Sequence, residues 1–141
     1  MKIDKIEIGN NHAPYVIAEI SANHNGEIED AKKLIRIARK AGASAVKIQT
    51  YTADTLTIDC KKDDFLIKKG LWKGKTLHQL YSEAYTPWEW HEELFAEADR
   101  NGITIFSSPF DRTAVDLLEE LGAPAYKIAS FEIVDIPLIR K

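Results

Sequence analysis

The chain has 141 residues, 45% of them apolar and 29% charged, and its 19 basic and 22 acidic residues give a net charge of −3. This length suits one compact domain, and the composition excludes a disordered chain. The negative charge gives no general attraction for nucleic acid or an anionic membrane. There is no membrane-spanning apolar run and no signal peptide, and the single Cys60 excludes an internal disulfide. We therefore expect a cytoplasmic protein without nucleic-acid or membrane partners.

Hydrophobic periodicity predicts alternating strands and helices along the chain. An N-terminal segment, residues 2–8, alternates as a short strand or hairpin would. The further strands are expected at 15–21, 44–50, 103–110 and 125–130, and the helices at 27–41, 77–85, 87–100, 114–121 and 135–141. This order indicates parallel βαβ units with right-handed crossovers. The pattern alone leaves open whether the sheet is doubly wound or part of a (β/α)₈ barrel.

Charged residues occur in three segments that otherwise resemble buried strands. They are Glu19, Lys47 and Lys127. Because an unpaired buried charge is costly, each needs a counter-ion or a ligand. Ligands of α/β folds bind where strands end, so the two lysines at corresponding places predict an anionic ligand, such as a phosphate or carboxylate. The alternative is that each lysine only neutralises Glu19 or Glu132 in a structural ion pair.

Polar side chains also stand near the ends of the expected strands. Gln49 has the strand parity of the lysine two positions before it, so both point to one face. Ser108 and Ser130 supply hydroxyl donors for anionic oxygens near the ends of two later strands. Lys127 and Glu132 have opposite parity. Both reach one site only if the last strand ends near Ser130.

The loop after the first expected parallel strand contains two further candidates. Asn23 and His24 are placed to contact a ligand, although capping of the following turn or helix explains His24 equally well. The histidines and Cys60 show no metal-ligand spacing, and the HExxH, CxxC, P-loop and GxGxxG patterns are absent. We therefore expect no metal site within this chain.

Taken together, the motifs resemble those of the sialic acid synthase family. They follow the family's order over nearly the whole chain: IAEI at 17–20, NHNG at 23–26, AGA at 41–43, VKIQT at 46–50, FSSPF at 106–110, and PAYKIAS at 124–130 followed by Glu132. Within that family, segments 51–55, 70–74 and 86–90 and the residue Phe131 resemble the pseudaminic acid synthase branch.

The resemblance implies a (β/α)₈ TIM barrel followed by an antifreeze-like domain. Residues 1–141 would then be the N-terminal half of the barrel domain, with four βα units behind a short hairpin and a last helix cut short. The family joins phosphoenolpyruvate to an open-chain N-acylated amino sugar and releases phosphate. The branch implies 2,4-diacetamido-2,4,6-trideoxy-L-altrose as the sugar, and the alternatives are the sugars of N-acetylneuraminate and legionaminic acid synthases.

The resemblance also implies roles for individual residues. The residues that would hold phosphoenolpyruvate are Lys47, Thr76, Ser108, Lys127 and Ser130. Those at the reacting centre would be Glu19, Gln49 and Glu132, with Asn23 and His24 on the sugar side. A divalent metal, Mn²⁺ or Mg²⁺, would be bound by ligands beyond residue 141. The whole enzyme is expected to be a homodimer and this chain alone to be inactive, and the alternative from another class is a fragment that only binds or oligomerises.

Overall fold

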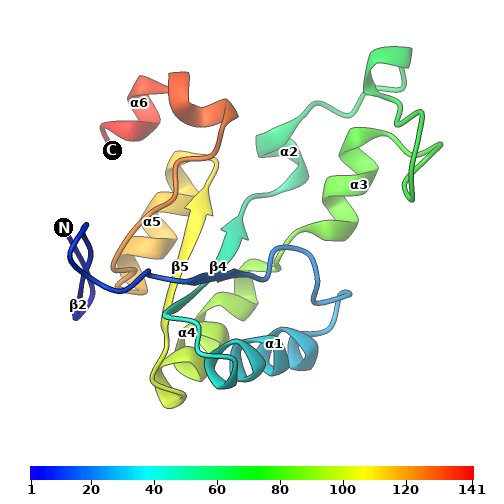
Figure 1. Cartoon of the computed structure of the whole chain (residues 1–141). Coiled ribbons are helices and arrows are strands. Elements are labelled where there is room, and N and C mark those ends of the chain that lie inside the picture. The colour runs from blue at the N-terminus through cyan, green and yellow to red at the C-terminus, as the bar shows by residue number, and fades with distance from the viewer.

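The computed structural model describes residues 1–141 and contains a parallel sheet of three strands with a small antiparallel pair to one side of it (Figure 1). The antiparallel strands are β1 (Lys2–Ile3) and β2 (Ile6–Glu7), and the parallel strands are β3 (Ile17–Glu19), β4 (Ala45–Thr50) and β5 (Thr104–Pro109). The α-helices are α1 (Ile28–Lys40), α2 (Ala53–Leu56), α3 (Leu77–Ala84), α4 (His91–Arg100), α5 (Arg112–Glu120) and α6 (Ile136–Ile139). Three short 3₁₀ helices are η1 (Asp63–Phe65), η2 (Trp88–Trp90) and η3 (Phe131–Val134). None of the helices is long and apolar enough to cross a bilayer.

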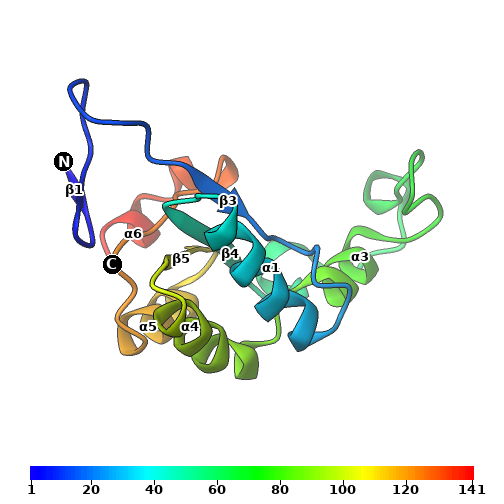
Figure 2. The ribbon, with the colours of Figure 1, turned by 60° about the horizontal axis from the view of Figure 1, so that its bottom comes forward.

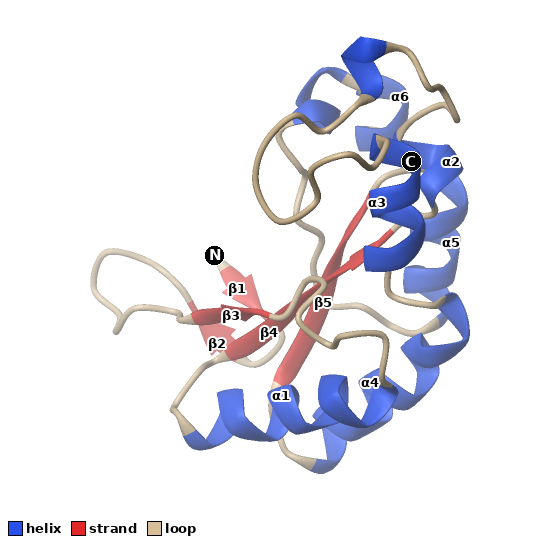
Figure 3. Cartoon of the chain, turned by 90° about the vertical axis from the view of Figure 1, so that its right-hand side faces the viewer, coloured by secondary structure: helices blue, strands red, loops and turns tan.

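The parallel strands lie side by side in chain order, β3-β4-β5. A doubly wound sheet would reverse this order at its switch point. Helices α1, α4 and α5 pack along one side of the strands (Figure 3), with α1 against β4 and both α4 and α5 against β5. Sequential parallel strands with helices on one side are the arrangement of a barrel segment, so the structure favours that alternative.

The hydrophobic core lies between the sheet and these helices. Val46 and Ile48 of β4 share the helix-facing parity and pack in one cluster with Ile35 of α1 and Leu94 of α4. The side chains of this set are at most 1% exposed. Alternate residues of β4 must therefore point to the opposite face of the sheet, which no helix covers.

Two of the turns that lead from a helix into the next strand depend on a glycine with a left-handed backbone. Gly42 after α1 has φ +89° and Gly102 after α4 has φ +61°. In each turn, the residue after the glycine donates its N–H to a carbonyl of the preceding helix: Ala43 to Ala38, and Ile103 to Ala98, at 3.0 and 3.1 Å. The helix ends predicted at these glycines are confirmed.

The strand expected at 125–130 is not formed. Only Tyr126 makes a bridge, to Ser107, and the Lys127 N–H donates to the Ser107 carbonyl at 3.0 Å. The segment lies at the border of the sheet, with β5 on one side and no strand on the other, so no second ladder supports it beyond this single bridge. The chain then turns at Ser130 into η3. The expectation of a fourth strand was wrong for this reason, although the segment follows the path of one.

The first parallel strand is also shorter and more exposed than its sequence predicts. Residues 15–21 were expected to form a buried strand, but β3 has three residues, and Val16 and Ile17 are 53% and 44% exposed. The cause is its position at the edge of the sheet, where it pairs only with β4.

Helix α3 starts where the sequence predicts, and α4 and α5 start differently. Thr76 caps α3, and its hydroxyl accepts the Gln79 N–H at 3.1 Å, as predicted. The helix expected from Pro87 begins instead as η2 and continues as α4, and α5 begins earlier than expected because Asp111 caps it.

Figure 2 shows the β1–β2 pair at one side of the molecule and α3, with the long segment before it, at the other.

Candidate functional site

A group of polar side chains stands on the face of the sheet that the helices leave uncovered. The register pairs Glu19 with Lys47, and Gln49 with Ser108. All four have the parity opposite to the core residues of β4 and β5. Glu19, Gln49 and Ser108 lie in the carboxyl-terminal halves of their strands and Lys47 lies at the middle of β4. The carboxyl ends of the strands are where barrel proteins form their ligand sites.

Lys47 and Glu19 form an ion pair between neighbouring strands. The Lys47 side chain is 13% exposed and that of Glu19 is 43% exposed. Glu19 is therefore not the buried carboxylate that its apolar sequence context suggested, because β3 is an edge strand. The ion pair between Lys47 and Glu19, which the sequence left as an alternative, is therefore formed. Lys47 lies two positions before Gln49 on the same face of β4.

The next pair along the strands offers hydrogen-bonding groups without partners. The Ser21 hydroxyl donates to Gln49 Oε1 at 2.5 Å, and the Gln49 amide nitrogen makes no hydrogen bond within the chain. Ser108 is 1% exposed, and its hydroxyl has no hydrogen-bond partner. A buried hydroxyl without a partner costs about 1–3 kcal/mol, so such groups are rare in folded proteins and fit a position where a ligand supplies the partner. Gln49 and Ser108 thus present donors on the same face as Lys47.

The three candidates near the C-terminus are Lys127, Ser130 and Glu132, and they lie in or just after the extended segment beside β5. Tyr126 shares the helix-facing parity of Ser107, to which it is bridged, so Lys127 has the parity of the uncovered face. The extended segment ends at Ser130, as the sequence argument required for Lys127 and Glu132. The Glu132 carboxylate has one buried oxygen without a partner, whereas Lys127 and Ser130 are exposed.

Three other predicted site residues make local contacts. Thr76 uses its side chain in the capping box of α3, and Asn23 donates to the Ile20 carbonyl at 2.8 Å. His24 is 1% exposed, accepts the Gly26 N–H at Nδ1, and packs edge-on against Trp90 with ring centroids 5.3 Å apart. Burial lowers the pKa of His24. The structure thus gives His24 the turn-capping contact considered as the alternative, and its Nε2 is buried without a partner. No hydrogen bond or ion pair joins Thr76, Asn23 or His24 to Lys47, Gln49 or Ser108.

The sequence reasoning missed a buried polar cluster directly behind this group. Thr50, Ser107 and His91 are each fully buried on the helix-facing side of the sheet, where strand parity predicts apolar residues. Two hydroxyl residues at the core parity of adjacent strands were the signal that could have revealed the cluster.

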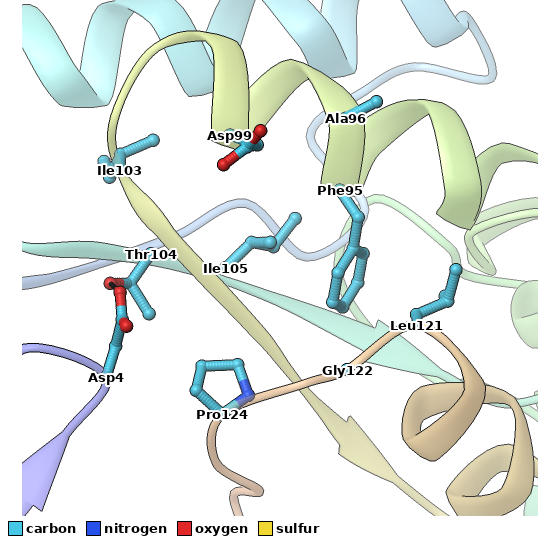
Figure 4. A pocket seen from close by; sticks show the side chains of 10 residues that line it. All are labelled: Asp4, Phe95, Ala96, Asp99, Ile103, Thr104, Ile105, Leu121, Gly122 and Pro124. Atoms are coloured by element: carbon cyan, nitrogen blue, oxygen red, sulfur yellow. Dashed lines mark hydrogen bonds between the residues drawn. The ribbon is translucent and has the colours of Figure 1, made fainter.

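A pocket of about 370 Å³ lies at the opposite ends of the strands (Figure 4). Phe95 and Leu121 project into it beside the start of β5, and Asp4 and Asp99 stand at its margin. Thr104 donates to the Asp4 carboxylate at 3.2 Å, which attaches the β1–β2 turn to the sheet. The pocket is remote from the polar residues at the carboxyl ends, so we assign the candidate site to the latter.

The side chains of this chain form no group of three or more His, Cys, Asp and Glu residues that could hold a metal ion. Glu19, the carboxylate on the strand next to β4, is already paired with Lys47. The residues present therefore do not by themselves fit a divalent metal.

The fold and these side chains define a class: a barrel-type α/β protein with a cationic and hydrogen-bonding site at the ends of its parallel strands. The chain matches the NeuB family over residues 34–141. Pseudaminic acid synthase of Campylobacter jejuni (strain NCTC 11168) is 52% identical over 126 residues, which are 89% of this chain and 37% of that protein. Pseudaminic acid synthase of Helicobacter pylori (strain 26695) is 49% identical over 91% of this chain and 38% of that protein.

Solved structures show the same similarity. The N-acetylneuraminic acid synthetase of Leptospira borgpetersenii, determined in complex with citrate, matches with a TM-score of 0.77 at 27% identity. The match covers 97% of this chain and 45% of the Leptospira chain. The spore coat polysaccharide biosynthesis protein SpsE of Bacillus subtilis matches with a TM-score of 0.75 at 30% identity. The match covers 99% of this chain and 36% of the SpsE chain. The chain belongs to the NeuB family, as its motifs predicted. It spans 37–38% of the length of the two pseudaminic acid synthases.

Proposed function

We propose that this chain forms the phosphoenolpyruvate-binding part of a pseudaminic acid synthase. The observation that carries the proposal is the alignment on one sheet face of the Lys47 ammonium with two donors that have no partner in the chain, the Gln49 amide nitrogen and the Ser108 hydroxyl. Phosphoenolpyruvate has a phosphate and a carboxylate, both of which accept charge-assisted hydrogen bonds from such groups. The identity of about 50% to two pseudaminic acid synthases supports the choice of reaction.

In the proposed reaction, phosphoenolpyruvate condenses with open-chain 2,4-diacetamido-2,4,6-trideoxy-L-altrose. The enol carbon forms a new C–C bond with the aldehyde carbon, and the aldehyde oxygen takes up a proton to become a hydroxyl. Water adds to the cationic carbon that bears the phosphate and loses a proton. The tetrahedral intermediate then expels phosphate, which leaves a 2-keto nonulosonic acid.

The chain's own residues have distinct tasks in this scheme. Lys47 and Lys127 neutralise the phosphate and carboxylate, and Ser108 and Ser130 donate hydrogen bonds to their oxygens. Glu19 keeps the Lys47 ammonium in position and, with Glu132, faces the sugar. Gln49 stands at the reacting centre, where its amide nitrogen donates to phosphoenolpyruvate. We propose that the divalent metal of the reaction takes its ligands from outside these residues, and no step here depends on it.

Only the degree of sequence identity to the relatives distinguishes between the alternative sugar substrates. A legionaminic acid synthase of Campylobacter jejuni is 38% identical over 89% of this chain. The higher identity to the pseudaminic acid synthases favours the altrose derivative. The alternative of a fragment that binds ligand without turnover remains a separate proposal about this chain alone.

Removal of the Lys47 ammonium tests the proposal. Because a hydrogen bond to a charged group contributes about 1.5–3 kcal/mol, Lys47→Ala should weaken phosphoenolpyruvate binding by roughly 10- to 100-fold in calorimetric titration of the 141-residue chain. Lys33→Ala is the matched control, because it removes an exposed lysine of α1. Equal affinities in the parent chain and both variants, or no binding by the parent chain, would refute the proposed site.

A further inference from the structure

A chain of three fully buried polar side chains connects the sheet to the start of helix α4. Thr50 Oγ1 lies 2.8 Å from His91 Nε2 and 2.7 Å from Ser107 Oγ. His91 is the first residue of α4, and its Nδ1 lies 3.1 Å from the Pro87 carbonyl oxygen. All three side chains are 0% exposed.

The chemistry of these groups sets the direction of each hydrogen bond. A carbonyl oxygen only accepts, so His91 Nδ1 carries the proton and donates to Pro87. Burial lowers the pKa of His91, which keeps the ring neutral and leaves Nε2 as an acceptor. Thr50 therefore donates to His91, and Ser107 donates to Thr50. One arrangement of protons is consistent with all three of these hydrogen bonds. It leaves the longer contact of 3.5 Å from Ser107 Oγ to the Ser108 carbonyl oxygen without a proton.

Thr50 and Ser107, two of the three hydrogen-bonded residues, are sequence neighbours of residues in the candidate site. Thr50 follows Gln49 on β4, and Ser107 precedes Ser108 on β5. Because successive side chains point to opposite faces, the buried contacts lie behind the sheet while Gln49 and Ser108 lie in front of it. Movement of the Thr50–Ser107 contact would therefore move the two site residues relative to each other.

We infer that the His91–Thr50–Ser107 chain positions Gln49 and Ser108 for phosphoenolpyruvate, an inference that rests on the proposed function. Thr50, Ser107 and His91 are positioning residues, because they act from the far side of the sheet. Stability alone does not account for them: apolar side chains of similar shape can replace a buried hydrogen-bonded group with little net cost. What the hydrogen bonds add is a single separation and orientation of the strand ends.

A pair of substitutions at one position separates the hydroxyl from the shape of the side chain. Thr50→Val keeps the shape and removes the hydroxyl, and Thr50→Ser keeps the hydroxyl. We expect calorimetric titration with phosphoenolpyruvate to give an affinity about tenfold weaker for Thr50→Val and within about twofold of the parent chain for Thr50→Ser. Ser107→Ala, which leaves the Thr50–His91 hydrogen bond in place, should also weaken binding and serves if Thr50→Val does not fold.

Two results would overturn the inference while leaving the proposed function intact. One is parental affinity in Thr50→Val and Ser107→Ala while Lys47→Ala loses binding. The other is equal weakening in Thr50→Ser and Thr50→Val, which would assign the effect to side-chain shape. Failure of the proposed function is recognised separately, because Lys47→Ala would then bind as the parent chain does or the parent chain would not bind.

Amide hydrogen exchange tests the positioning without a ligand. Thr50→Val should speed exchange at residues 49–51 and at residues 107 and 108, and leave the exchange of α1 unchanged. Unchanged exchange at both strand ends would contradict the inference even if the parent chain bound no phosphoenolpyruvate.

Discussion

Acid sensitivity of the contact between helices α1 and α4 is the most direct stability prediction from this structure. Glu97 of α4 has a side chain only 8% exposed, and its carboxylate accepts from Arg36 of α1 at 2.9 Å and from Arg100 and Asn101 at 2.5 and 2.9 Å. These contacts, the Arg100 hydrogen bond first among them, lower the pKa of Glu97 from 4.5 to about 2. Glu97→Gln removes the charge and keeps the side-chain size.

The depressed pKa determines the direction of the effect. The ionised carboxylate stabilises the folded state fully above pH 4.5, and this contribution is lost as the pH falls from 4.5 towards 2. At about 1.36 kcal/mol per pH unit, the fall in pKa sets an upper bound of about 3.4 kcal/mol. The Arg36 and Arg100 side chains are 40% and 62% exposed, so solvent screening reduces the expected loss at pH 7 to about 1–2 kcal/mol.

Urea denaturation at a series of pH values between 7 and 3 measures this effect. The difference in unfolding free energy between the parent chain and Glu97→Gln should shrink as the pH falls below 4.5. Glu93→Gln is the matched control, because Glu93 also lies on α4 and pairs with α1 through Lys32, but its side chain is 59% exposed. A pH-independent difference for Glu97→Gln, or an equal loss in both variants, would refute the reasoning.

Three further predictions concern the core, one turn and catalysis. Leu94→Ala should lower the unfolding free energy by about 2–5 kcal/mol in urea denaturation, because Leu94 is 0% exposed. The control Leu71→Ala, at a residue that is 92% exposed, should change the unfolding free energy by less than about 0.5 kcal/mol. Gly102→Ala should cost about 1–2 kcal/mol in the same assay because its φ is +61°, and Gly9→Ala, at a glycine without a positive φ, should not. Incubation of the 141-residue chain with phosphoenolpyruvate, the altrose derivative and Mn²⁺ should release no phosphate above background, and clear turnover would contradict this prediction.

Most helices and two of the three parallel strands were predictable because their signals are local. The apolar residues of α1 recur at helical spacing, and the glycines after α1 and α4 mark turns that favour a left-handed backbone. The family was predictable too, because its motifs occur in order along the chain. The failures were at the borders of the sheet. Segment 125–130 has the composition of a strand, but a strand is completed only by neighbours on the sheet.

The candidate site was predictable in part. Strand parity placed Lys47 and Gln49 on one face, and the register of β4 against β5 added Ser108 to it. The same reasoning treated Glu19 as buried and left His24 open between a ligand contact and a turn cap, and both depend on what packs beside them. Glu19 is at an edge strand, and His24 packs against Trp90, which lies 66 positions later in the chain.

The amino-acid sequence on its own therefore establishes the family, the alternation of strands and helices, and the residues available for chemistry, because these depend on composition and spacing along the chain. Tertiary structure decides which charges are paired, which hydroxyls are buried, and which strand lies at an edge. Thr50, Ser107 and His91 illustrate the difference: they are distant in sequence, and only the packing of α4 on β4 and β5 brings their polar atoms together. Contacts of this kind arise from long-range packing, which periodicity and local motifs do not encode.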